Sequence, residues 1–126
     1  MFAVRSWFFD ITYYAISYDK LLELLEKWKN DVLANLKYKP EIFDCDDFAN
    51  YFKVWMTKET GVNCTGEALG LVYKDGRLLG GHAWNIVIVH KHGVIDVLFV
   101  EPQLGEIIEN QKTSDGWEYY LLAVLV

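Results

Sequence analysis

The hydrophobic pattern of this 126-residue chain changes its period near Gly61, and that change limits the folds it can adopt. Over Ser17–Leu36 apolar side chains recur every three or four residues, which predicts an amphipathic helix. A second such pattern begins at Asp44, a favourable N-cap, and continues to about Thr57 or Glu59. After Gly61 the apolar residues instead form short runs rich in β-branched side chains, which favour strands.

The second half therefore predicts a series of antiparallel strands. Lys74-Asp75-Gly76 contains the Asp-Gly pair that is the strongest short hairpin signal. We expect strands at Ala68–Tyr73, Arg77–Leu79, Ala83–Val89, Val94–Val100 and Tyr119–Val126, the last of them central in the sheet. Two helices followed by such strands predict an α+β fold in which N-terminal helices pack on an antiparallel β-sheet.

Composition limits the function as well as the fold. The length suits a single domain over residues 1–126. A formal net charge of −6 excludes nucleic acid as a partner, because phosphate binding requires a basic face. Arg5 and Asp10 interrupt the apolar run at Met1–Ile16, so we expect neither a membrane span nor a signal peptide. We therefore expect the protein to be cytoplasmic.

Cys45 stands in the first turn of the second predicted helix. Unpaired N–H groups and the helix dipole at that position favour a thiolate, which is the nucleophilic form of cysteine. The neighbouring Asp44, Asp46 and Asp47 oppose thiolate formation, so a basic partner would be needed. The alternative is a buried cysteine that fills a gap at a helix end.

His82 is the candidate for that partner, since it follows Gly80-Gly81 at the start of an apolar strand. If Ala83–Val89 and Val94–Val100 form an unbulged hairpin, His82 lies directly opposite Glu101, at about 5 Å between Cβ atoms. A carboxylate there would fix the imidazole tautomer. The alternatives are that His82 has only a structural role and that Glu101 is merely the polar end of a strand.

Three short motifs in this order resemble those of a known family. They are Phe43-Asp44-Cys45-Asp46-Asp47-Phe48-Ala49, then Gly81-His82-Ala83-Trp84-Asn85, then Glu101-Pro102-Gln103. The set is similar to the papain-like cysteine protease domain at the C-terminal end of a mushroom agglutinin from Marasmius, with related stand-alone domains in microbial and phage proteins. It also resembles transglutaminase-like cysteine peptidases.

The resemblance implies a papain-like or transglutaminase-like fold and a cysteine hydrolase, a probable peptidase acting on a peptide or protein through a thioester. Cys45 would be the nucleophile, His82 the base and Glu101 the orienting acid. Trp84 or Gln103 could donate a hydrogen bond to the oxyanion. The family's protease needs calcium, for which Asp46 and Asp47 are the natural candidates.

Two other functions remain open at this stage. One is a non-catalytic binding or assembly module that retains the fold, and the aromatic content would also suit a homodimer. The other is transglutaminase-like transfer of an acyl group to an amine, which shares the same covalent intermediate as hydrolysis.

Overall fold

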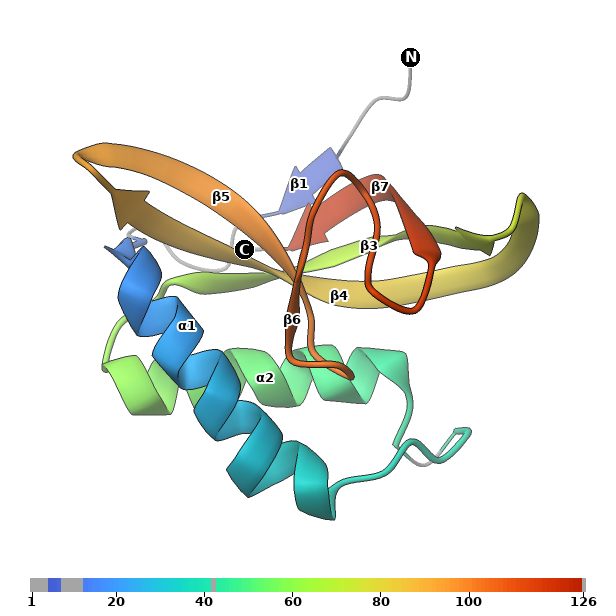
Figure 1. Cartoon of the computed structure of the whole chain (residues 1–126), viewed down its shortest axis with the longest axis horizontal. Helices are drawn as coiled ribbons and strands as arrows, with labels where there is room; N and C mark the ends of the chain where they lie inside the picture. Colours follow the sequence, from blue (N-terminus) through green and yellow to red (C-terminus); the bar gives the residue numbers. More distant parts are fainter. Residues whose placement is uncertain (1–4, 8–12, 42, 126) are drawn as a thin grey trace.

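The computed structural model describes residues 5–7, 13–41 and 43–125. Two short strands come first, β1 (Arg5–Trp7) and β2 (Ile16–Ser17), followed by the helices α1 (Tyr18–Lys27) and α2 (Cys45–Thr60). Between these helices the chain winds as a π-helical segment, η1 (Trp28–Val32), and a 3₁₀ turn, η2 (Leu33–Asn35). The remaining strands are β3 (Thr65–Lys74), β4 (Arg77–Lys91), β5 (Val94–Glu101), β6 (Glu106–Ile108) and β7 (Trp117–Leu125) (Figure 1).

One sheet dominates the molecule. Its strands lie in the order β1-β7-β3-β4-β5-β6, with β2 paired to β4 outside that path. Among the described strands, β1 with β7 and β2 with β4 run parallel, and the other pairs are antiparallel. The papain-like or transglutaminase-like α+β class is therefore wrong for this chain: it is a mostly antiparallel sheet with two short helices on it. The order of helices and later strands was predicted correctly.

The first helix begins where the sequence predicts but changes its winding early. The Ser17 Oγ accepts a hydrogen bond from the Lys20 N–H at 3.1 Å, which confirms the N-cap. The α-helix then ends at Lys27 and continues as η1 from Trp28. The indole Nε1–H of the buried Trp28 donates to the Pro102 carbonyl at 2.7 Å. Trp28 and Pro102 are far apart in the sequence, so the helical period could not reveal this contact.

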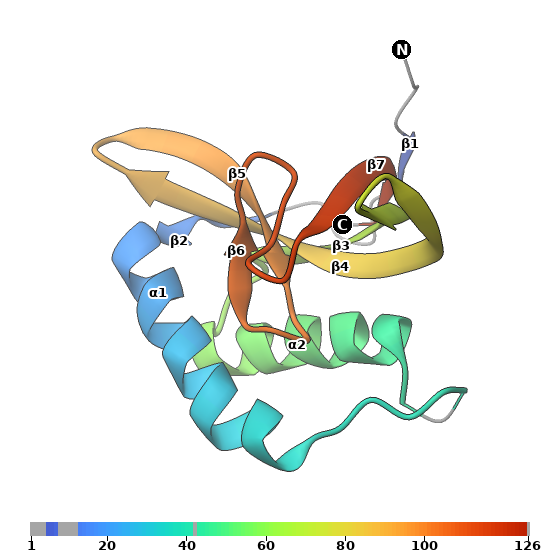
Figure 2. The same ribbon diagram turned by 45° about the vertical axis from the view of Figure 1, so that its right-hand side comes forward.

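The second helix agrees closely with its predicted limits. Asp44 is the N-cap, and its N–H donates to the Asp47 Oδ2 at 3.2 Å. Gly61 ends the helix with φ +73°, a left-handed conformation that glycine adopts without strain. Both helices lie on one side of the sheet (Figure 2), and none of the described helices is long and apolar enough to cross a membrane.

Two tight turns set the register of the central strands. Asp75 and Gly76, with φ +52° and +75°, join β3 to β4, as the sequence predicts. The two strands predicted at Arg77–Leu79 and Ala83–Val89 form one continuous strand, β4. His92 and Gly93 alone make the next turn, with Lys91 paired to Val94.

The sheet carries apolar side chains on both faces. Val87 and Val89 of β4 pack with Trp28 and Phe52 from the helical side. Residues two apart share a face of a strand, so the intervening positions of β4 point to the opposite side. There Trp84 and Ile86 form a second cluster with Ala68, Val72, Ile108 and Tyr119. The final strand β7 lies between β1 and β3, inside the sheet as expected.

Candidate functional site

A recess of about 340 Å³ opens where several distant parts of the chain meet. The start of α2 contributes Cys45, β4 contributes His82, and the turn after β5 contributes Gln103. The other lining residues are Tyr38, Val72, Leu79, Gly81 and Trp117. The lining therefore combines aromatic and aliphatic surface with a few polar groups, as small-ligand sites do.

A buried hydrogen bond between His82 and Glu101 lies at the floor of this recess. The His82 Nε2 and the Glu101 Oε1 are 2.5 Å apart, and the two side chains are only 5% and 3% exposed. The sequence prediction that these side chains meet is confirmed, but its register is not. The predicted register places Ala83 opposite Val100, whereas Asn85 lies there in the structure, so His82 reaches Glu101 diagonally across the hairpin.

Two further donors fix the Glu101 carboxylate. The Tyr119 hydroxyl donates to Oε1 at 2.9 Å, and the Gln103 N–H donates to Oε2 at 3.0 Å. Burial, followed by the charge of Glu101, raises the pKa of Tyr119, so this phenol keeps its proton and remains a donor. Glu101 thus joins β4, β7 and the turn after β5 beneath the recess.

The surroundings of Cys45 oppose the thiolate that its position at a helix start favours. Burial raises the pKa of its thiol above the ordinary value, and the nearby Asp44 and Asp46 carboxylates raise it further. Backbone N–H groups of Ala83 and Asp46 act in the opposite direction but do not reverse the shift. Within the described part of the chain, no hydrogen bond or ion pair joins Cys45 to His82.

Trp84 and Gln103, the two side chains predicted to donate to an oxyanion, lie in different places. Gln103 lines the recess, whereas Trp84 is 1% exposed and belongs to the second apolar cluster. The sequence analysis did not identify Tyr38, Leu79, Trp117 or Tyr119 as site residues. Trp117 and Tyr119 lie next to each other on one face at the start of β7, and that alternation was their only signal.

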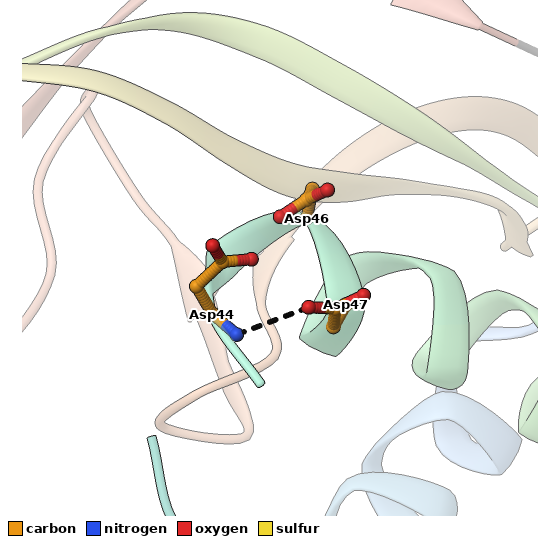
Figure 3. A group of neighbouring side chains, drawn as sticks. All are labelled: Asp44, Asp46 and Asp47. Atoms are coloured by element: carbon orange, nitrogen blue, oxygen red, sulfur yellow. Dashed lines mark hydrogen bonds between the residues drawn. The ribbon is translucent and has the colours of Figure 1, made fainter. Parts of the chain in front are cut away.

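Three carboxylates gather at the first turn of α2. Oxygen atoms of Asp44, Asp46 and Asp47 lie within 4.8 Å of one another (Figure 3). A hydrogen bond to Asp46, then burial, raises the pKa of Asp44 to about 6. The Asp44 Oδ1 is buried and has no hydrogen-bond partner among the described residues. Oxygen donors suit calcium, which takes six to eight of them, and calcium binding by Asp46 and Asp47 stays a prediction.

The fold belongs to a class that includes lectin structures. The structure of the PSL1a–E64 complex matches with a TM-score of 0.68 and 26% identity, covering 98% of this chain and 44% of that one. Polyporus squamosus lectin, solved with the human-type influenza-binding epitope Neu5Acα2-6Galβ1-4GlcNAc, matches with a TM-score of 0.64 and 25% identity. That match covers 98% of this chain and 42% of the lectin chain.

Residues 3–107 match the family model described as agglutinin C-terminal. The chain therefore belongs to the agglutinin C-terminal family. It spans less than half the length of the two solved chains. No curated protein matches this chain.

These findings correct the prediction that the chain is a cysteine hydrolase. The resemblance to the end of an agglutinin is confirmed, but the matching family is described as agglutinin C-terminal and one of the two solved neighbours is a lectin. They do not support a papain-like protease domain, a cysteine peptidase-like hydrolase or a thiol protease.

Proposed function

We propose that this chain is a non-catalytic binding module and that its ligand, a neutral saccharide, binds in the recess between Cys45, His82 and Trp117. The observation that carries the proposal is the recess itself, whose volume of about 340 Å³ lies in the range of small-ligand sites. Membership of an agglutinin family supports a binding role, and one solved neighbour is a lectin with a bound glycan epitope.

The polar groups of the recess suit a ligand rich in hydroxyl groups. Gln103 offers both a side-chain donor and an acceptor, and His82 offers the ring nitrogen that Glu101 does not use. Aromatic and aliphatic side chains surround these groups, so a saccharide could pack its C–H groups against them while its hydroxyls find partners. In this proposal Cys45 and His82 are binding residues, and Glu101 positions the His82 ring.

Charge favours a neutral ligand over an acidic one. Asp44 and Asp46 lie beside Cys45 at the N-terminus of α2, and Glu101 lies beneath His82. The formal net charge of the chain is −6. A carboxylate on the ligand would be repelled by these groups. We therefore expect Galβ1-4GlcNAc to bind more tightly than the sialylated form, Neu5Acα2-6Galβ1-4GlcNAc.

The test is a calorimetric titration of the full chain with these two saccharides. Leu79→Arg should block the recess, because Leu79 lines it and is 47% exposed, so the new side chain need not disturb the core. Leu78→Arg is the matched control, since Leu78 is 52% exposed and does not line the recess. We expect binding of Galβ1-4GlcNAc to be lost in Leu79→Arg and kept in Leu78→Arg.

Absence of binding of either saccharide to the wild-type chain would overturn the proposal. Equal binding by Leu79→Arg and wild type would also overturn it, because the saccharide would then occupy another surface. Tighter binding of the sialylated form would leave the recess in place but contradict the argument from charge.

A further inference from the structure

The outer edge of β5 is open toward the end of the β4–β5 hairpin. Strand β6 pairs with β5 only over residues 99–101, and none of the described strands pairs with the outer side of residues 94–98. Figure 1 shows this part of the hairpin projecting from the sheet above the start of α1. An unpaired edge of this kind is a template on which a further strand can add.

The register of the hairpin sets the direction of the backbone groups on this edge. Lys91 and Val94 flank the two-residue turn and therefore form a hydrogen-bonded pair. Because such pairs alternate along a strand, Ile95 and Val97 direct their N–H and C=O groups away from β4. The Val97 N–H agrees with this direction, since it donates to the Asp96 Oδ1 at 2.8 Å. Two residues of β5 thus offer backbone groups to a partner strand.

The side chains along this edge differ between its two faces. Asp96 pairs with Val89, which packs on the helices, so Asp96 lies on the helical side of the sheet. Ile95 and Val97 lie on the opposite side, where they are 70% and 46% exposed. A strand that adds here would therefore meet aliphatic side chains on one face and a carboxylate on the other.

Charge selects a basic partner over a second copy of this chain. Antiparallel pairing that uses both Ile95 and Val97 of each copy would place the two Asp96 carboxylates directly opposite each other. Like charges in that position destabilise a sheet, and each copy carries a formal net charge of −6. A cationic side chain opposite Asp96 would instead attract its carboxylate and free the Val97 N–H for pairing.

We propose that residues 95–97 of β5 bind an extended segment of another protein in which a lysine or arginine stands between two aliphatic residues. The segment adds to the sheet as an antiparallel strand. Its aliphatic residues form hydrogen-bonded pairs with Ile95 and Val97, and its basic residue lies opposite Asp96. Of the described residues that line the recess, none belongs to β5, so this inference does not rest on the proposed function.

NMR titration of the full chain with the blocked peptide acetyl-Thr-Val-Lys-Val-Thr-amide tests the proposal. We expect the backbone amide signals of Ile95 and Val97 to shift. N-methylation of both valines removes the two N–H donors that face β5, so binding should weaken at least tenfold. N-methylation of the lysine is the matched control, because its N–H points away from β5, and this peptide should bind within about threefold of the parent.

Asp96→Lys tests the role of charge and should weaken binding of the parent peptide at least tenfold. Asp31→Lys is the matched control, since it reverses the charge of another exposed acid, on η1, and should bind as wild type does. An absence of shifts at Ile95 and Val97 would overturn the proposal. Equal binding of the two methylated peptides, or equal binding by the two variants, would also overturn it.

Light scattering and amide hydrogen exchange separate this partner from a second copy. We expect a monomer whose Ile95 amide exchanges fast and becomes protected when the peptide is added. A dimer that protects the Ile95 amide without peptide, and exposes it on dilution to the monomer, would show that a second copy occupies the edge and would overturn the proposal.

Discussion

At the scale of single residues, Glu101 organises the floor of the recess. It accepts hydrogen bonds from His82, Tyr119 and the backbone of Gln103, and all of these groups are buried or partly buried. A carboxylate with so many donors holds three parts of the chain in one arrangement. Its loss would leave these donors without their acceptor.

We predict that Glu101→Gln destabilises the fold by about 1–3 kcal/mol, because the single amide oxygen cannot replace both carboxylate oxygens and a buried donor left without an acceptor costs about this much. Urea unfolding measures the effect. The matched control is Glu118→Gln, since Glu118 contacts Lys112 at 3.6 Å near the surface. An exposed pair of this kind contributes about 0–1 kcal/mol. Equal losses in the two variants would show that the Glu101 network adds nothing to stability.

Asp44 makes stability depend on pH in a defined direction. Its pKa is raised from an ordinary value of 3.8 to about 6, chiefly by a hydrogen bond to Asp46. The folded state therefore holds a proton that the unfolded state releases, and the contribution of Asp44 to stability falls as pH rises from about 4 to about 6. Above that range no further loss occurs.

Asp44→Asn should remove this pH dependence while keeping a favourable N-cap. We predict that the melting temperature of wild type, relative to that of Asp44→Asn, falls between pH 4 and pH 6 and is constant above. Asp31→Asn, an exposed acid on η1, should keep the wild-type profile. A difference between wild type and Asp44→Asn that is the same at every pH would contradict the raised pKa.

At the scale of elements, the contact between β3 and β7 depends on a glycine. A Cβ at Gly70 would collide with the Tyr120 carbonyl oxygen of β7 and lie 2.7 Å from the Trp84 ring. The register of the pair shifts between Leu69 and Gly70 at this point. The two backbones can approach closely here because glycine has no side chain.

We therefore predict that Gly70→Ala destabilises the fold by about 1–3 kcal/mol through overpacking. Gly81→Ala is the matched control on the neighbouring strand, where the added Cβ would have only the Gly70 carbonyl oxygen at 4.0 Å. Its effect should stay within about 1 kcal/mol, since the methyl group also restricts the unfolded chain. Comparable melting temperatures for the two variants would refute the close approach.

Elements with a strong periodic signal could be predicted from the sequence, and those defined by distant contacts could not. The limits of α2 follow from Asp44 and Gly61, and the β3–β4 turn follows from Asp75-Gly76. Strands β1, β2 and β6 have only two or three residues each, too few to show a period.

The site shows the same division. The meeting of His82 and Glu101 could be inferred because one hairpin joins their strands. Trp117 and Tyr38 reach the recess from parts of the chain that no local pattern connects to it. For Cys45 the sequence showed two opposing influences, the helix start that favours the thiolate and the neighbouring carboxylates that oppose it; burial, the largest cause of its raised pKa, could not be read from the sequence.

At the scale of the whole molecule, the chain is a domain of the agglutinin C-terminal family, and we propose the recess as its binding surface. Motif order alone favoured a hydrolase, because a cysteine, a histidine and an acid in that sequence are shared by many thiol enzymes. Family and fold instead relate the chain to agglutinin and lectin structures. The central claim is therefore that Cys45 lines a binding recess and forms no bond with the ligand.

The most direct test of this claim uses E64, the compound with which PSL1a was solved. Wild type and Cys45→Ala are incubated with E64 at neutral pH, and intact masses are measured after denaturation. Because the pKa of the thiol is raised, we predict an unchanged mass for both proteins and equal affinities for Galβ1-4GlcNAc. A stable E64 adduct on wild type that is absent from Cys45→Ala would contradict the account, since Cys45 would then be a reactive nucleophile.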